Sequence, residues 1–363
     1  MYDKELEIEL VDRDARHQVN QLVTRWIKDG RMESPSASVV RRGQNGPVMG
    51  SIVVTTSGAG CPQLTQEVIL YDRIKRVDIA DRVLKDMTPT QEVYFAFPFR
   101  MDNPEFRFEG PLSVIRPFRD QFPGSNSNYY SVQDWADVSD GKRGISFCPV
   151  DAHLVEFGGL NSSEISQAHH AVKPVTFGAP FVKELTKGHM YSFVINNNYR
   201  TNMPPVQLGD VLFRYSISSH KGDWIEGRAK RFGWSVRNPL FPVVVEEQAK
   251  GELPESLSLC QIDKPNVVVI TLKRAEDDEG IVVRLHETEG QDTAVNVTMP
   301  GMRMVKAYET DVMEKNIRSL EASEGSVRID VNGFGLKTMR IMRSATQSQC
   351  GTPDSEKQAR VKR

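Results

Sequence analysis

Short runs of β-branched and aromatic residues recur along the whole chain, and they constrain its fold more than any other feature. Examples are Ser51–Thr56, Val93–Phe99 and Val211–Ile217, and clusters of Gly, Pro, Asn and Asp separate such runs. Between Val68 and Ile79, apolar and charged residues alternate as in a half-exposed strand. This pattern is typical of antiparallel β-structure and not of alternating βαβ units, so we predict an all-β chain.

One segment, His17–Gly30, carries a helical signal instead. Its apolar residues recur at helical spacing, and a terminal glycine suits a helix C-cap. The periodicity predicts an amphipathic helix whose apolar face is formed by Val19, Leu22, Val23, Trp26 and Ile27.

A change in composition near Val245–Leu259 marks a boundary between two parts of the chain. Apolar content drops there, and Gly, Pro and charged residues accumulate. At least five short strands with glycine or acidic turns follow, which predicts a separate small β-sandwich. The polar stretch Ser344–Arg363 lacks periodicity, so we expect a disordered tail.

Charge and hydropathy exclude several classes of partner. The 363 residues include 46 basic and 48 acidic ones, and the net charge of -2 gives no reason to expect nucleic acid or an anionic membrane as a partner. No apolar run approaches the roughly 18 residues of a membrane span, and the polar N-terminus does not resemble an export signal. Four widely spaced cysteines fit reduced thiols. We therefore expect a cytoplasmic protein.

Three segments carry a resemblance to a known family. They are Tyr191–Trp224, with its dense polar and aromatic hinge, Val93–Gly110 and Gln133–Gly159. Together they resemble the C-terminal β region of glycoside hydrolase family 38, the α-mannosidases. The start, YDKELEIELVD, resembles a turn and strand in the middle of that β region. The C-terminal strands resemble the family's last domain, with its lysine, glutamate-aspartate, glycine, arginine-leucine and glutamate in the same order.

The resemblance implies both a fold and a domain organisation. The expected architecture is a galactose-mutarotase-like β-supersandwich over residues 1–245, a linker over 246–264, a C-terminal β-sandwich over 265–343 and a tail over 344–363. In the family, residues 17–30 would form a connection over the β domain and not a helix. The chain would begin inside a fold, because a zinc-binding barrel and a helical bundle precede this region in the family.

The implied function is hydrolysis of α-mannosidic bonds in glycans, with zinc and the nucleophile supplied by the barrel. This chain would be the accessory, carbohydrate-facing part and inactive alone, with no cofactor of its own. The expected partners are a mannose-containing glycan and a separately encoded catalytic barrel. An exposed strand edge and uncovered apolar surface would also favour homo-oligomers.

The residues themselves offer no catalytic or metal site. A catalytic zinc needs three protein ligands held close together, and none of the seven histidines begins a His-x-Asp pair. His169 and His170 would point to opposite faces of a strand. Glycosidases also need two carboxylates flanking the scissile bond. The acidic clusters Glu276–Glu279 and Asp134, Asp137 and Asp140 are predicted to be solvated turns.

The segment Asn196–Asn202 is the best candidate for contact with a sugar. Amides and a guanidinium can form paired hydrogen bonds to vicinal hydroxyls, and a tyrosine ring offers an apolar face to a pyranose. The predicted substrate-binding residues are Asn197, Asn198, Tyr199, Arg200 and Asn202. The alternative is that these asparagines hold an irregular connection through their own backbone.

Other interpretations remain open at this point. His220–Trp224 is an ordinary turn with a core tryptophan, and Phe99–Gly110 is a strand exit whose charges pair across an inter-domain surface. As alternatives to the function implied by the resemblance, the chain would be a stand-alone, non-catalytic carbohydrate-binding protein or the product of a truncated gene. A mutarotase-type enzyme would need a facing histidine and carboxylate, for which His153 with Glu156 and His220 with Asp223 are the only close pairs.

Overall fold

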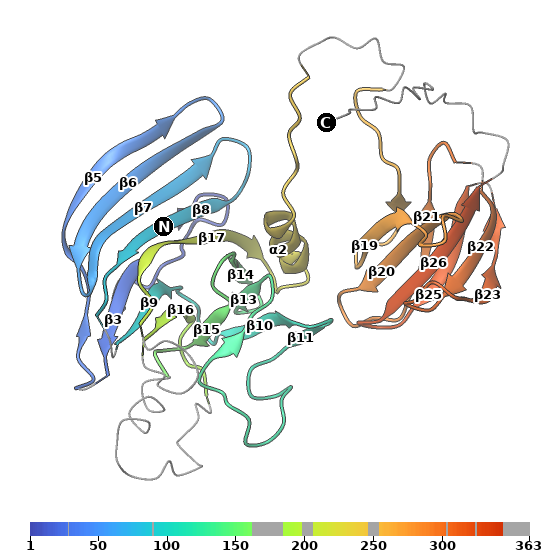
Figure 1. Cartoon of the computed structure of the whole chain (residues 1–363). Coiled ribbons are helices and arrows are strands. Elements are labelled where there is room, and N and C mark those ends of the chain that lie inside the picture. The colour runs from blue at the N-terminus through green and yellow to red at the C-terminus, as the bar shows by residue number, and fades with distance from the viewer. Residues whose placement is uncertain are drawn as a thin grey trace, which may run out of the picture. The chain divides into compact units, whose positions relative to one another are not determined.

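A computed structural model describes residues 1–27, 29–88, 91–161, 184–197, 206–245, 254–302, 304–323 and 325–343. The chain divides into two compact units, Met1–Val243 and Val244–Arg363 (Figure 1). Strands dominate both units, and the described residues contain one helix, α2 (Ala229–Arg237). The all-β prediction is confirmed.

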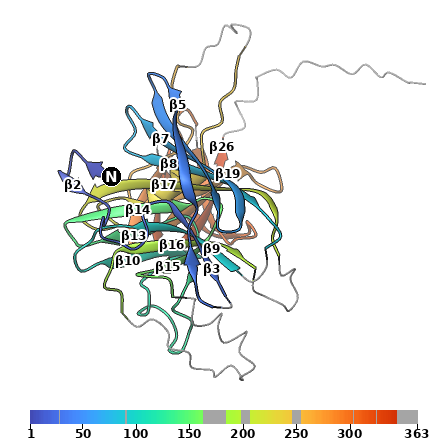
Figure 2. The same ribbon diagram turned by 90° about the vertical axis from the view of Figure 1, so that its left-hand side faces the viewer.

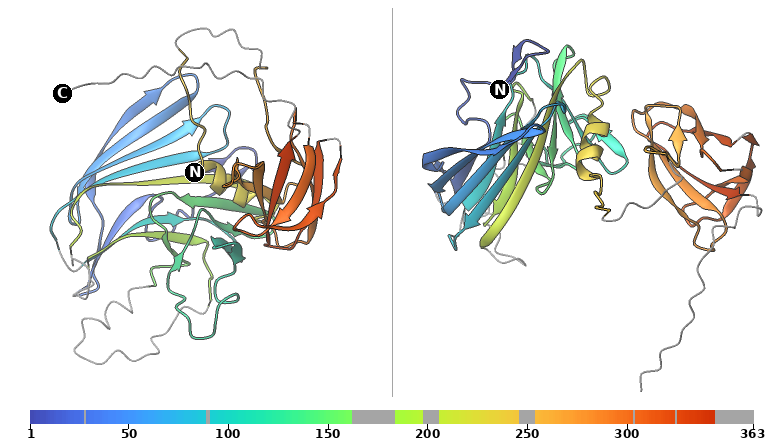
Figure 3. Two further views of the ribbon diagram at one scale, coloured as in Figure 1. Left: turned by 45° about the vertical axis from the view of Figure 1, so that its right-hand side comes forward. Right: turned by 90° about the horizontal axis from the view of Figure 1, so that it is seen from above.

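The first unit contains a nine-stranded and a six-stranded antiparallel sheet, together with the small pair β1 (Tyr2–Asp3) and β2 (Ile8–Glu9). The nine-stranded sheet has the order β11 (Ser113–Ile115), β10 (Glu105–Gly110), β13 (Ala136–Ser139), β14 (Arg143–Pro149), β17 (Gly209–Lys221), β8 (Val77–Lys85), β7 (Cys61–Tyr71), β6 (Met49–Gly58) and β5 (Ser36–Asn45). The six-stranded sheet has the order β12 (Tyr130–Ser131), β15 (Leu154–Phe157), β16 (His189–Asn196), β9 (Gln91–Pro98), β3 (Gln21–Trp26) and β4 (Met32–Glu33). Figure 2 shows β8, β17, β14, β13 and β10 one below another, and in the left panel of Figure 3 the long strands β5 to β8 run side by side.

An aromatic core lies between these two sheets. Alternate residues of β9 point into it, so Phe95 and Phe97 are fully buried. Phe97 lies 4.7 Å from Phe147 and 4.9 Å from Tyr215 between ring centroids, and both partners belong to the nine-stranded sheet. Each such side chain contributes about 1.5–3 kcal/mol through burial, so the contact between the sheets stabilises the unit.

The predicted helix at His17–Gly30 is wrong, because the structure has strand β3 there. β3 pairs with β9 on one side and with β4 on the other. Leu22 belongs to the core between the sheets, and its neighbour Val23 packs in a second apolar cluster on the opposite face. A strand buried on both faces has consecutive apolar residues, which a short sequence window does not distinguish from a helical face. Gly30 adopts a positive φ of 71° in the turn that follows.

The second unit is a smaller sandwich with its own core. A four-stranded sheet has the order β18 (Gln261–Ile262), β21 (Thr293–Thr298), β25 (Ser326–Val331) and β24 (Ala322–Ser323). A five-stranded sheet has the order β19 (Val267–Arg274), β20 (Ile281–Glu287), β26 (Leu336–Arg343), β22 (Met304–Thr310) and β23 (Asn316–Leu320). Valine, isoleucine, leucine and methionine side chains from both sheets fill the space between them. Among the described residues of either unit, no helix has the length and apolarity that crossing a membrane requires.

Candidate functional site

The predicted sugar-binding segment begins at the end of strand β16, and of the five predicted substrate-binding residues only Asn197 can be placed. Asn198, Tyr199, Arg200 and Asn202 lie outside the described residues. The side chain of Asn197 is buried and donates from Nδ2 to the Thr88 carbonyl oxygen at 3.2 Å. Its Oδ1 accepts from the Gln207 N–H at 2.8 Å. Asn197 therefore ties the end of β16 to two other segments, and the contact of these five residues with substrate stays a prediction.

A buried polar cluster lies on the face of the six-stranded sheet that is opposite the aromatic core. Arg25 on β3 faces Glu92 on β9 in direct register, and the two form a buried ion pair. The Tyr94 hydroxyl donates to the same Glu92 carboxylate at 2.8 Å, and the Tyr94 ring stacks on Phe193 at 4.6 Å between centroids. A buried charge is tolerated when it is paired and hydrogen-bonded, so this cluster fixes the ends of β3, β9 and β16 relative to one another.

Neither of the two close histidine–carboxylate pairs forms in the structure. His153 Nδ1 lies 3.0 Å from the Val132 carbonyl oxygen, while the Glu156 carboxylate accepts from the Asn161 backbone N–H. Asp223 accepts from the backbone N–H groups of the turn that follows it. The facing histidine and carboxylate that a mutarotase-type reaction needs are therefore not built from these residues.

His220 pairs instead with Asp137, at 2.7 Å from Nε2 to Oδ2. Burial acts to lower the His220 pKa, but the hydrogen bond and charge of Asp137 outweigh it, and the pKa is raised. A Cβ atom on Gly144 or Gly227 would lie within 2.3 Å of the imidazole, so both glycines are needed for this packing. The prediction that Asp137 lies in a solvated turn is wrong, because this residue is fully buried in β13.

Two further residues singled out from the sequence pack around helix α2. Trp224 stacks on the buried Trp135, with ring centroids 5.6 Å apart and an angle of 17° between the rings. Glu109 forms a buried ion pair with Lys230 of α2, which also lies 4.0 Å above the Trp234 ring. Burial lowers the Lys230 pKa to about 7. Glu109 thus pairs within its own unit, which corrects the expectation that its charge meets an inter-domain surface.

The zinc of the family's reaction has no fitting donor set among the described residues. They contain no group of three His, Cys, Asp or Glu side chains that could hold a metal ion. His189 lies 2.9 Å from Asp12, but no third donor joins this pair to make such a group. No catalytic step through a metal is therefore derived for this part of the chain.

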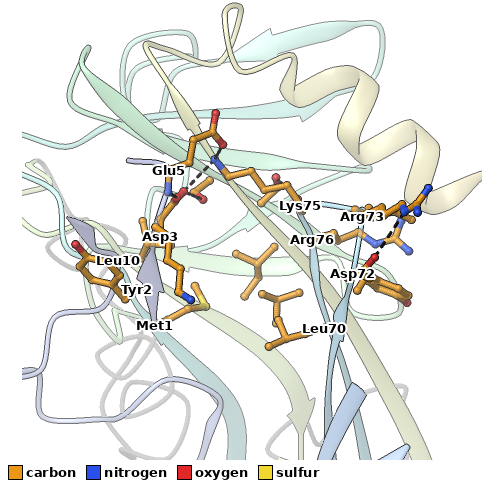
Figure 4. Close-up of a pocket in the computed structure, with 17 residues that line it drawn as sticks. Met1, Tyr2, Asp3, Glu5, Leu10, Leu70, Asp72, Arg73, Lys75 and Arg76 are labelled. Atoms are coloured by element: carbon orange, nitrogen blue, oxygen red, sulfur yellow. Dashed lines mark hydrogen bonds and ion pairs between the residues drawn. The ribbon is translucent and has the colours of Figure 1, made fainter. Parts of the chain in front are cut away.

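A cavity of the first unit lies beside strands β1, β7 and β17 (Figure 4). It has a volume of about 660 Å³. Asp3, Glu5 and Lys75 lie on one side and Asp72, Arg73 and Arg76 on another, with Leu70 between them. This size falls within the roughly 300–1,000 Å³ of small-molecule sites.

Ion pairs neutralise most of the charge in this pocket. The Lys75 ammonium lies 3.0 Å from Asp3 and 2.8 Å from Glu5. Burial raises the Asp3 pKa, but hydrogen bonds from Ser219, Lys75 and two backbone N–H groups outweigh it, and the pKa is lowered to about 2. Asp3 is therefore a permanent anion at neutral pH, and it holds Lys75 in place at the pocket wall.

Comparison with known proteins identifies the C-terminal part of the chain. Residues 266–339 match the family model described as the glycosyl hydrolases family 38 C-terminal beta sandwich domain. The sandwich of the second unit is therefore similar to the C-terminal sandwich domain of glycoside hydrolase family 38. Alpha-mannosidase G of Dictyostelium discoideum is 24% identical over 140 residues, which cover 37% of this chain and 13% of that protein.

Two solved structures from Enterococcus faecalis share the fold of nearly the whole chain. An alpha-mannosidase of strain V583 matches with a TM-score of 0.69, and a second family 38 protein matches with 0.67. Each is 12% identical, and each match covers 93% of this chain. The chain spans 40% and 41% of these structures, well under half of either. The predicted resemblance to the C-terminal β region of family 38 is confirmed.

The charged residues of the family 38 sandwich motif are used to hold its loops. Lys273 pairs with Glu314 at 2.8 Å, Asp277 pairs with Arg340 at 2.6 Å, and Arg284 donates to the Thr338 hydroxyl at 3.1 Å. The fully buried Glu287 accepts from the Asn266 side chain and from the backbone N–H groups of Glu289, Gly290, Gln291 and Phe334. These residues therefore connect strands and loops of the second unit.

Proposed function

We propose that this chain is the C-terminal, carbohydrate-binding β portion of an α-mannosidase-type glycoside hydrolase that acts on mannose-containing glycans. The observation that carries the proposal is the match of residues 266–339 to the family 38 C-terminal sandwich. The similarity to alpha-mannosidase G and the shared fold with the Enterococcus alpha-mannosidase support it. Zinc and the catalytic nucleophile would come from a barrel outside this sequence.

The state of the buried carboxylates supports the placement of catalysis elsewhere. Retaining glycosidases need two carboxyl groups about 5–5.5 Å apart and inverting ones about 6.5–9.5 Å, both open to substrate. Glu92, Glu109 and Asp137 are instead buried and paired with Arg25, Lys230 and His220. A carboxylate held in this way is not available as a nucleophile or a general acid.

Hydrolysis and binding assays on the purified chain test the proposal. We expect no release of nitrophenol from a nitrophenyl α-mannoside, with or without added zinc, and measurable binding of α-mannosides by calorimetry. Zinc-dependent turnover that a single substitution in this chain abolishes would overturn the assignment of catalysis to a barrel. Absence of any mannoside binding, by the chain alone or together with an added family 38 barrel, would refute the carbohydrate-binding role.

A further inference from the structure

We propose that the 660 Å³ pocket beside β1, β7 and β17 binds a neutral sugar of one or two rings, separately from the Asn196–Asn202 segment. This inference extends carbohydrate binding to a second place on the chain and does not depend on mannose specificity. The pocket is formed by three stretches of chain: the residues around β1, the connection from β7 to β8, and the end of β17.

The balance of charge favours a neutral ligand. Four basic residues line the pocket, Lys4, Arg73, Lys75 and Arg76, against the three acidic residues Asp3, Glu5 and Asp72. Lys75 bridges Asp3 and Glu5, and Arg73 lies 3.6 Å from Asp72. An anionic ligand that approached Arg73, Lys75 or Arg76 would also meet the carboxylate paired with that cation, and a cationic ligand that approached Asp3, Glu5 or Asp72 would meet the paired cation.

The polar groups suit hydroxyl groups because the pocket wall carries both donors and acceptors. The Glu5 and Asp72 side chains are 66% and 65% exposed, and the Arg73 side chain is 93% exposed. A sugar hydroxyl both donates and accepts, so it can bridge a carboxylate and a neighbouring cation without breaking their charge balance. Arg76 is held in place by its 2.9 Å contact with Asp78 and by its position 5.0 Å from the Tyr71 ring centroid.

Apolar groups in the same pocket suit the C–H face of a sugar ring. Leu70 and Ile74 are 56% and 52% exposed, although they lie beside the buried Ile217. Tyr2 is 59% exposed and adds an aromatic ring to the wall (Figure 4). Sugar sites combine such apolar surface with a few convergent polar groups.

Two other cavities of the molecule lack this combination. The cavity of about 750 Å³ in the second unit is lined by aliphatic and methionine side chains together with Lys273, Arg274 and Asp278, and no aromatic residue lines it. The cavity beside the end of α2 measures about 280 Å³, at the lower limit of small-molecule sites. Size, aromatic surface and balanced charge coincide in the pocket beside β1.

The test is a titration of the ¹⁵N-labelled chain with the methyl α-glycosides of mannose, glucose and galactose. We expect at least one of them to shift the amide resonances of residues 70–76. Tyr2→Ala and Arg73→Ala should each raise the Kd of that sugar about tenfold, because each removes a ligand contact. Both side chains are exposed, so folding should be unchanged. Arg82→Ala, which removes an exposed ion-paired arginine outside the pocket, should leave the Kd as it was.

The outcomes separate this proposal from the proposed function. Binding of glucosides or galactosides alone, lost in the two pocket variants, supports the pocket, and the proposed function is then decided separately by mannoside binding in the presence of an added family 38 barrel. Mannoside binding that Arg200→Ala abolishes, with the resonances of residues 70–76 unmoved, overturns the pocket and leaves the proposed function intact. Binding of mannose 6-phosphate without binding of any neutral sugar also overturns the proposed pocket, because it would show that the paired charges of the pocket select an anionic ligand.

Discussion

The structural role of Asn197 can be separated by experiment from the sugar contacts predicted for Asn198 and Arg200. The Asn197 side-chain amide donates a hydrogen bond to the Thr88 carbonyl oxygen and accepts one from the Gln207 N–H. We expect Asn197→Ala to lower the free energy of unfolding by about 1–3 kcal/mol, because it leaves buried backbone groups unpaired. Arg200→Ala and Asn198→Ala should instead weaken α-mannoside binding by about 1–3 kcal/mol and change stability by less than about 0.5 kcal/mol.

Urea unfolding and calorimetric titration of the same three variants check this prediction. Asn197→Ala is the matched control for Asn198→Ala, because it removes the same side chain at the adjacent position. A large stability loss in Asn198→Ala and Arg200→Ala, with binding falling in parallel, would make the whole segment structural and remove it as a sugar site.

The buried carboxyl group of Asp81 should make the stability of the chain depend on pH. Burial raises its pKa to about 7, although Asn20 and Gln66 donate hydrogen bonds to it. Among the described residues, Asp81 Oδ2 and Asn20 Oδ1 have no hydrogen-bond partner. Because the folded state binds the proton more tightly than the unfolded state, whose pKa is near 3.8, stability falls as pH rises from about 4 to about 7.

The variant Asp81→Asn should remove this dependence. Asparagine is a neutral side chain of the same shape as the protonated aspartic acid, and its N–H group can donate a hydrogen bond to Asn20 Oδ1. We expect the variant to gain about 1–3 kcal/mol relative to the native chain between pH 5 and pH 8, since one titrating group contributes at most about 1.4 kcal/mol per pH unit. Urea unfolding at the two pH values measures the difference, and a relative loss at pH 8 would contradict a protonated Asp81.

Among the secondary-structure elements, helix α2 packs on the sheet through a close contact between Gly233 and Trp135. A Cβ atom on Gly233 would lie 2.8 Å from the Trp135 Cβ, so the helix packs on the sheet by way of this glycine. We expect Gly233→Ala to lower the free energy of unfolding by about 1–3 kcal/mol, despite the roughly 1 kcal/mol that alanine gains in a helix. Ser235→Ala, on the exposed side of the same helix, should stay within about 0.5 kcal/mol. Equal unfolding energies for the two variants would show that α2 is not packed so closely.

The elements also show what the sequence could and could not predict. Runs of β-branched and aromatic residues indicate strands at β9 and β17, because turn residues separate these runs from their neighbours. β3 was predicted as a helix instead, because the adjacent apolar residues Leu22 and Val23, buried on opposite faces of the strand, also fit a helical spacing. Helix α2 was not predicted, because Gly233 lies in its middle and Lys230, a charged residue, faces the protein interior. Asp137 looked solvated because its partner His220 is 83 residues away.

For the whole molecule, the chain between the two cores is an exposed apolar segment. Leu240, Phe241, Val243, Val244 and Val245 are 71–96% exposed. Such surface favours association, so we expect self-association that increases with protein concentration. A variant with Leu240→Ser, Phe241→Ser and Val244→Thr should shift sedimentation toward the monomer, whereas Val312→Thr, an exposed change elsewhere, should not. A native chain that sediments as a monomer at every concentration would disagree with this prediction.

The arrangement around Glu287 has a consequence for how changes spread through the second unit. One carboxylate accepts from the loop at residues 289–291 and from Phe334 in another loop. The two loops are more than 40 residues apart in sequence, yet both donate to the same carboxylate. Opening of one loop would leave the Glu287 carboxylate with fewer donors to hold it, so we expect a substitution in one loop to lower the local stability of the other as well.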